Sequence, residues 1–182
     1  MGNREIKYKD VIRIEMEKLA KNPKTIFIGY NVKKGRAGGM LINVLEKQIF
    51  ETPVAENLMA GIAIGLSIEG YLPILYFERF NFILNALDAI VNHLDKFEDL
   101  SYGEYKPKII IRAVIGSIKT PFLTGSTHTQ DFTEAIKKMV TFDVVKLPLN
   151  IKDIKKIYED AYLSKKSTLI VEEKDLYNIQ LT

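Results

Sequence analysis

The 182-residue sequence contains no cysteine, which excludes disulfides, zinc–thiolate sites and catalysis by a thiol. It has only two histidines, His93 and His128, so a metal site built from histidines alone is not expected. No uninterrupted apolar run approaches the length that spans a membrane, and the first residues are charged rather than signal-like. We therefore expect a cytoplasmic protein with no metal site of its own.

The sequence also lacks a long run of basic residues, and its net charge of +3 is small for its length. Both features argue against nucleic-acid binding. Hydrophobic residues make up 47% of the chain and charged residues 27%, which is typical of a folded domain with a buried core. Because neither an internal repeat nor an interdomain linker is visible, we expect a single domain over residues 1–182.

Predicted strands alternate with predicted helices along the chain. Short apolar segments typical of strands lie at 25–30, 49–51, 72–77, 108–115, 142–147 and 168–172. Segments with helical spacing or helix-start signals lie at 9–21, 52–70, 82–97, 131–140 and 154–161. This alternation predicts an α/β fold, a three-layer sandwich around a mostly parallel central sheet.

Glu56 is unusual because it precedes an apolar run with almost no other polar side chain. Burial of an ionisable group costs free energy unless the group has a partner. Glu56 either stabilises the start of its helix through the helix dipole, worth about 0.3–1 kcal/mol, or binds a ligand. With Thr52 as N-cap and Pro53 as first helical residue, a capping-box glutamate would stand at position 55. This spacing weakens the first alternative and leaves both open.

Two glycines, Gly61 and Gly65, stand inside the predicted helix that follows Glu56. Each costs about 1 kcal/mol of helix stability relative to alanine. We expect the missing side chains to permit close approach of another element. A tightly packed helix with a carboxylate at its start suits a ligand site or an interface.

Two further segments carry candidate site residues. Phe80 and Phe82 follow a predicted strand, with Asn85 close behind, and each ring is either a core residue or a stacking surface for a flat heterocycle. His128 lies in a loop rich in hydroxyl and amide side chains, and is either an exposed loop residue or a functional group. Ligands of open α/β sheets bind beyond the carboxyl ends of strands, so we expect these residues and Glu56 to share one rim.

The basic loop at 31–39 invites comparison with phosphate-binding loops. It lacks the Gly-Lys-Ser/Thr ending of a P-loop, and Gly61 and Gly65 do not form the Gly-x-Gly-x-x-Gly motif of dinucleotide-binding folds. The sequence therefore contains neither of these nucleotide-binding motifs, although the basic loop could contact an anionic substrate.

In this order, the segments resemble the pyrimidine-binding domain of transketolase-like thiamine diphosphate enzymes, most closely the beta subunits of 2-oxoacid dehydrogenase decarboxylase components. The resemblance extends over nearly the whole chain and rests on Thr52–Asn57, Leu72–Ile74, Phe80–Phe82, Ala86–Asp88 and His128–Gln130. It implies a thiamine diphosphate-binding fold. It also implies an enzyme that acts on a 2-oxo acid or a ketose, by decarboxylation or two-carbon transfer.

By this resemblance, Glu56 hydrogen-bonds the aminopyrimidine ring of thiamine diphosphate. A carboxyl that shares a proton with a ring nitrogen favours the imino tautomer, whose exocyclic nitrogen removes a proton from the thiazolium carbon. Phe82 packs against the pyrimidine with Phe80 beside it, and Asn85 supplies a polar contact. His128 lies near the reacting substrate as a proton donor or orienting group. The resemblance thus implies Glu56 and His128 as the catalytic residues.

The sequence departs from the family in having no Gly-Asp-Gly motif, the signature of the domain that binds the diphosphate and its Mg²⁺. The resemblance therefore implies a partner, a diphosphate-binding alpha-type subunit, that completes the active site in a homo- or hetero-oligomer. We expect neither that domain nor the C-terminal domain of the beta subunits in this chain. A non-catalytic assembly or regulatory module with the same fold is the alternative.

Overall fold

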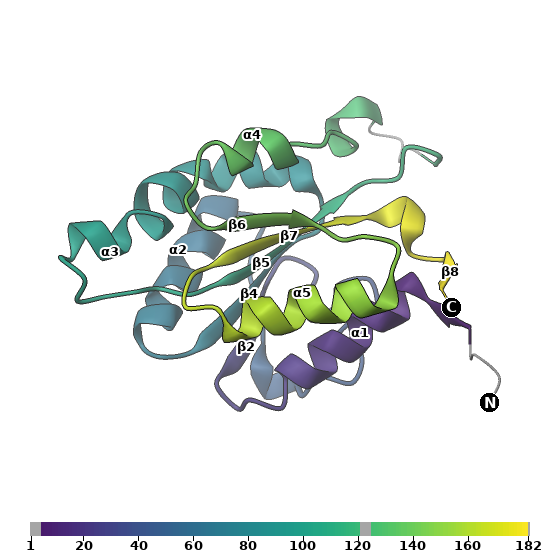
Figure 1. Cartoon of the computed structure of the whole chain (residues 1–182), viewed down its shortest axis with the longest axis horizontal. Coiled ribbons are helices and arrows are strands. Elements are labelled where there is room, and N and C mark those ends of the chain that lie inside the picture. The colour runs from purple at the N-terminus through teal and green to yellow at the C-terminus, as the bar shows by residue number, and fades with distance from the viewer. Residues whose placement is uncertain (1–4, 121–124, 182) are drawn as a thin grey trace.

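The computed structural model describes residues 5–120 and 125–181, so part of the polar loop before His128 lies outside the description. A six-stranded sheet forms the middle layer (Figure 1). Its strands are β2 (Thr25–Gly29), β3 (Ile49–Glu51), β4 (Leu72–Phe77), β5 (Ile110–Ile115), β6 (Asp143–Lys146) and β7 (Thr168–Glu173). Every pairing is parallel, in the order β3-β2-β4-β5-β7-β6. The predicted α/β sandwich with a mostly parallel sheet is confirmed.

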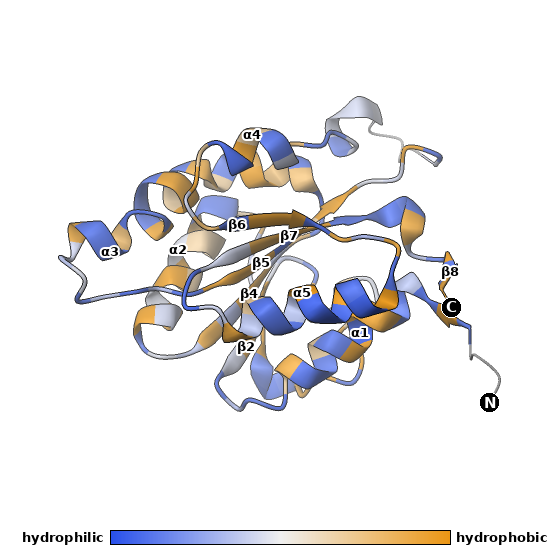
Figure 2. Ribbon diagram, in the orientation of Figure 1, coloured by the Kyte–Doolittle hydropathy of each residue, from blue (hydrophilic) through white to orange (hydrophobic). Residues whose placement is uncertain are grey.

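Helices cover both faces of the sheet. On one face lie α1 (Tyr8–Leu19) and α5 (Ile151–Leu163), and on the other lies α2 (Glu56–Ile68). Successive strand residues point to opposite faces, so β5 contributes to two separate cores. Figure 2 shows hydrophobic colouring on the strands and hydrophilic colouring on the outer side of α5. Within the described residues, no helix is long and apolar enough to cross a membrane.

Two short strands were not predicted. β1 (Ile6–Lys7) and β8 (Gln180–Leu181) pair antiparallel in a separate two-stranded sheet. This pairing brings the two described ends of the chain together beside α1 (Figure 1). Two residues are too few to show the alternating pattern from which a strand is predicted.

The helix after β3 begins later than predicted, and Thr52 is not its N-cap. The Thr52 backbone N–H donates to the Gly29 carbonyl at 3.0 Å, which prolongs the β3–β2 pairing. The chain therefore remains extended past the predicted cap, and Ala55 occupies the N-cap position instead. Glu56 is the first residue of α2, so the spacing argument against a role at the helix start was wrong.

The expectation for the two glycines inside α2 was also wrong for the described chain. A Cβ atom built on Gly61 or Gly65 would meet no atom within 4 Å, and both residues are exposed. They lie on the outer side of the helix rather than against another element. The predicted end of the helix is confirmed, because Gly70 follows with a φ of +79°, the left-handed conformation that terminates helices.

The helix predicted at 82–97 is divided into three segments. They are a 3₁₀ helix (Phe80–Ala86), a π-helix (Asp88–Leu94) and the short helix α3 (Phe97–Leu100). The buried residues of the first segment, Phe80, Ile83 and Ala86, are three apart. A 3₁₀ helix has three residues per turn and keeps such residues on one side. A continuous α-helix would rotate them away from the core.

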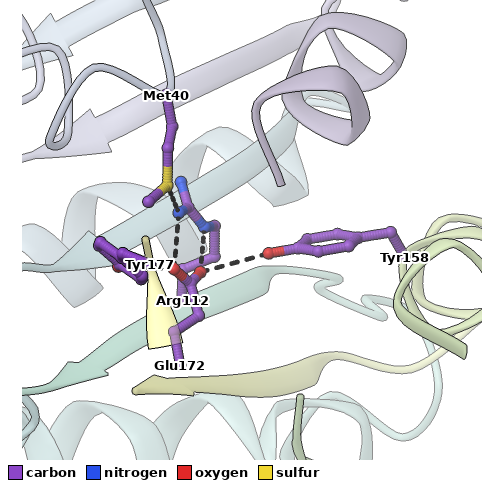
Figure 3. A network of polar contacts seen from close by, with 5 residues as sticks. All are labelled: Met40, Arg112, Tyr158, Glu172 and Tyr177. Atoms are coloured by element: carbon purple, nitrogen blue, oxygen red, sulfur yellow. Dashed lines mark hydrogen bonds and ion pairs between the residues drawn. The ribbon is translucent and has the colours of Figure 1, made fainter. Parts of the chain in front are cut away.

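A buried ion pair that was not predicted joins β5 to β7 (Figure 3). Arg112 donates to Glu172 through Nε at 2.6 Å and through Nη2 at 3.0 Å. The hydroxyl groups of Tyr177 and Tyr158 donate to the same carboxylate at 2.8 and 3.2 Å. Arg112 also contacts the sulfur of Met40, in the loop before β3. Both the guanidinium and the carboxylate therefore have further polar contacts besides each other.

We expect Glu172→Gln to lower the free energy of unfolding by about 3–5 kcal/mol, because it leaves the Arg112 charge buried without a counter-charge. Urea denaturation followed by circular dichroism measures this loss. Glu159→Gln, an exposed change on α5 at a residue without an ion pair among the described residues, serves as the control. A Glu172→Gln variant as stable as this control would contradict the assigned role.

Asp131 stabilises the turn into the short helix α4 (Thr133–Lys137). Its Oδ1 accepts a hydrogen bond from the backbone N–H of Thr133 at 2.9 Å, and its Oδ2 accepts one from Lys146 Nζ at 3.0 Å. Burial alone raises the pKa of this carboxyl, but the hydrogen bonds and the charge of Lys146 hold the pKa below its usual value. The folded chain therefore favours the ionised form.

This shift predicts a pH dependence. The contribution of Asp131 is fully present above the pKa of an unfolded aspartate and is lost as the pH falls below about 4. We expect Asp131→Asn to lower the urea midpoint at pH 7 and to flatten its decline in acid. Asp143→Asn is the control, since Asp143 is exposed and its side chain makes no hydrogen bond or ion pair with the described residues. An Asp131→Asn variant with the wild-type midpoint and acid slope would refute the prediction.

Candidate functional site

Glu56 lies beyond the carboxyl end of β3 and is only 8% exposed. Its Oε2 accepts a hydrogen bond from Asn85 Nδ2 at 3.3 Å, a long contact. The N-cap residue of α2, Ala55, makes no side-chain capping bond, and among the described residues the Glu56 carboxylate bonds only Asn85. The helix dipole favours a negative charge at this position. Most of the hydrogen-bonding capacity of this carboxyl nevertheless remains unused by the described residues.

Phe82 and His128 contact each other across the same edge of the sheet. Their ring centroids are 5.2 Å apart and the rings are inclined at 81°, an edge-to-face arrangement. Both residues are half-buried. The Nδ1 atom of His128 lies 3.0 Å from Thr127 Oγ1, which leaves Nε2 without a partner among the described residues. This arrangement leaves one imidazole nitrogen able to exchange a proton with a ligand.

The 3₁₀ segment Phe80–Ala86 connects these two contacts, because it carries both Asn85 and Phe82. Asn85 is exposed, so its amide can also reach a ligand. Phe80, by contrast, is fully buried and packs against Phe132 with 5.8 Å between ring centroids. Its position agrees with the core-packing alternative. The structure thus brings Glu56 to Asn85 and Phe82 to His128, and places Phe80 beneath them.

Thr52 was predicted to cap a helix and has a different environment. It is 4% exposed, and its hydroxyl has no hydrogen-bond partner among the described residues. A buried polar group without a partner costs about 1–3 kcal/mol. Such groups require an explanation, and a bound molecule is one. The sequence offered no signal for this, since a threonine before a proline also suits a helix cap.

A cavity of about 420 Å³ lies at the same edge, where β4, β5 and β7 end. Its four basic residues come from separate segments of the chain and are Lys9, Arg79, Lys119 and Lys174. Their separation in the sequence explains why no basic patch was predicted. Burial, and then the charge of Arg79, lower the pKa of Lys174.

The cavity is also lined by two carboxylates, Glu78 and Asp175. Glu78 lies 3.6 Å from Arg79 and accepts a hydrogen bond from Asn31 at 3.3 Å. Asp175 accepts hydrogen bonds from Ser117 and from the backbone N–H of Ile118. Because four basic side chains face these two carboxylates, the lining keeps a net positive charge, which suits a negatively charged group. Within residues 5–120 and 125–181, no three histidine, aspartate or glutamate side chains are grouped to hold a metal ion.

The sequence of this chain is similar to the sequences of known proteins. The pyruvate dehydrogenase E1 component subunit beta of Chaetomium thermophilum is 29% identical over 170 residues, covering 90% of this chain and 43% of that protein. The corresponding subunit of Rickettsia conorii is 27% identical over 179 residues, covering 95% and 54%. The chain therefore spans about half the length of the curated relatives it matches.

Solved structures share the fold. A structure described as "Split gene transketolase, inactive beta4 tetramer" superposes with a TM-score of 0.71 at 18% identity, and covers 91% of this chain and 51% of that one. Residues 4–180 match the protein family described as "Transketolase, pyrimidine binding domain". This match confirms the resemblance inferred from Thr52–Asn57 and the later segments. The chain belongs to the family of transketolase pyrimidine-binding domains.

Proposed function

We propose that this chain supplies the aminopyrimidine-binding half of a thiamine diphosphate site. The enzyme would act on a 2-oxo acid or a ketose, by decarboxylation or two-carbon transfer. The observation that carries the proposal is the buried carboxyl of Glu56, which has a single long hydrogen bond within the described part of the chain, from Asn85. Membership of the pyrimidine-binding family and similarity to pyruvate dehydrogenase beta subunits support it.

The residues at this edge fit an aminopyrimidine. The Glu56 carboxyl has free hydrogen-bonding capacity, which suits a proton shared with a ring nitrogen, and Asn85 offers an amide to the polar side of the ring. Phe82 provides a half-buried aromatic surface for packing. When bound, thiamine diphosphate supplies the carbon nucleophile that attacks the substrate carbonyl. His128, through Nε2, would donate a proton to the substrate or orient it.

The other half of the site is proposed to come from a partner, a diphosphate-binding alpha-type subunit that also holds Mg²⁺. The chain has no Gly-Asp-Gly sequence, so it lacks the usual means of anchoring the diphosphate. The solved neighbour is described as an inactive beta4 tetramer of a split gene transketolase. That description supports a chain that assembles with copies of itself, and we propose that such an assembly needs the partner for activity.

The cationic cavity supports a negatively charged substrate. It opens where β4 and β5 end, and the segments that carry Phe82 and His128 follow these same two strands. A 2-oxo acid carries a carboxylate that the side chains of Arg79 and Lys174 could bind. The cavity therefore favours an acidic substrate over a neutral one.

The role of Glu56 is testable by reconstitution. The full chain is mixed with thiamine diphosphate, Mg²⁺ and a candidate partner subunit that contains a Gly-Asp-Gly motif, and turnover of 2-oxo acids and ketoses is measured. We expect Glu56→Gln to reduce kcat by about 10²–10⁴-fold, the usual worth of acid–base assistance. Glu69→Gln, at the exposed end of the same helix, should leave kcat unchanged. Undiminished turnover in Glu56→Ala would sink the proposal.

The division of the site between two chains predicts weak cofactor binding by this chain alone, because the anchoring of the diphosphate is absent. Isothermal titration of thiamine diphosphate and Mg²⁺ into the isolated chain should show little or no heat. Tight binding would contradict a shared site. A chain that self-associates, ignores the partner and gains no stability from the cofactor would support the non-catalytic alternative.

A further inference from the structure

Three consecutive residues of the 3₁₀ segment hold three alternate residues of the segment 128–132. The contacts join Phe80 to Phe132 at 5.8 Å, Asn81 to Gln130 at 2.7 Å, and Phe82 to His128 at 5.2 Å. The outer two are contacts between aromatic rings, and the middle one is a hydrogen bond from Asn81 Nδ2 to Gln130 Oε1. Three side-chain contacts thus attach the segment with His128 to the 3₁₀ segment, and the contact of Asn81 is the middle one.

The ring contacts and the hydrogen bond contribute differently. Edge-to-face contacts between rings tolerate sliding, whereas a hydrogen bond of 2.7 Å fixes direction and distance. The Oδ1 atom of Asn81 is buried and has no partner within the described residues, which is unfavourable. An apolar side chain would avoid this cost and would lose the contact with Gln130. Asn81 is therefore better explained by its hydrogen bond to the loop that carries Gln130 than by packing in the core.

The other side of His128 is held by the main chain. The backbone N–H of Gly116, directly after β5, donates to the His128 carbonyl at 2.9 Å. A Cβ atom at Gly116 would lie only 2.2 Å from that carbonyl oxygen, so the approach requires glycine. His128 is therefore fixed between β5 and the 3₁₀ segment, and only the second attachment uses side chains.

We infer that Asn81 is a positioning residue, which holds Gln130 and thereby keeps His128 against Phe82. This inference rests on the proposed function, because it explains how a loop histidine is kept ready to act on a substrate. Asn81 itself does not act on the reacting atoms.

The test uses the full chain and needs no partner or cofactor. Hydrogen exchange of the Gly116 amide, followed by NMR, reports release of the His128 carbonyl, and the His128 ring shifts report its contact with Phe82. We expect Asn81→Ala to speed this exchange by about fivefold, the usual effect of losing one hydrogen bond, and to shift the His128 ring signals. Gln130→Ala should do the same, and the double variant should add nothing further.

Two further variants make the result decisive. Asn81→Asp should restore slow exchange, since its carboxylate can accept from the Gln130 amide. Asn43→Ala removes an exposed side-chain hydrogen bond of the same length, to Glu17 in α1, and should leave Gly116 and His128 unchanged. Unchanged Gly116 exchange in Asn81→Ala would overturn the inference, as would additive effects in the double variant. These readouts do not depend on turnover, so failure of the proposed function at Glu56 is recognised separately.

Discussion

In a parallel sheet the carboxyl ends of all strands lie at one edge, and every residue of the candidate site follows such an end. Glu56 follows β3, Phe82 follows β4 and His128 follows β5. These strands occupy three of four neighbouring positions, separated only by β2. The order and parallel direction of the strands therefore bring residues distant in the sequence to one edge of the sheet.

The buried pair of Arg112 and Glu172 positions residues that line the cavity at this edge. Tyr76 lies under the guanidinium at 5.2 Å, Tyr177 donates to the carboxylate, and both tyrosines line the cationic cavity. Buried ion pairs add little net stability compared with apolar residues, but they are strongly unfavourable when only one partner is present. The pair thus favours one arrangement of β5, β7 and the C-terminal segment. That arrangement places Tyr76 and Tyr177 in the lining of the cavity.

The sequence predicted the features that depend on local periodicity. All six strands of the main sheet were located, because continuous apolar runs are typical of strands buried on both faces. The start of α2 was misplaced, since pairing of β3 with β2 keeps Thr52 extended and no local pattern reports that pairing. The ion pair was missed for the same reason: Arg112 stands within an apolar run, and its partner lies sixty residues away in sequence. The residues of the candidate site were selected from sequence patterns and remain a prediction, whereas the contacts among them could not be predicted.

Glu56 shows why the local explanation of a charged residue is incomplete. Its place as the first residue of α2 makes a favourable dipole interaction, which was underestimated from the sequence. That interaction is available to any exposed acidic residue in the first helical turn, and it requires neither burial nor a contact with Asn85. Burial removes water from the carboxyl, and a single contact of 3.3 Å replaces little of that hydration. The dipole accounts for the sign of the charge, and the proposed ligand would account for its burial.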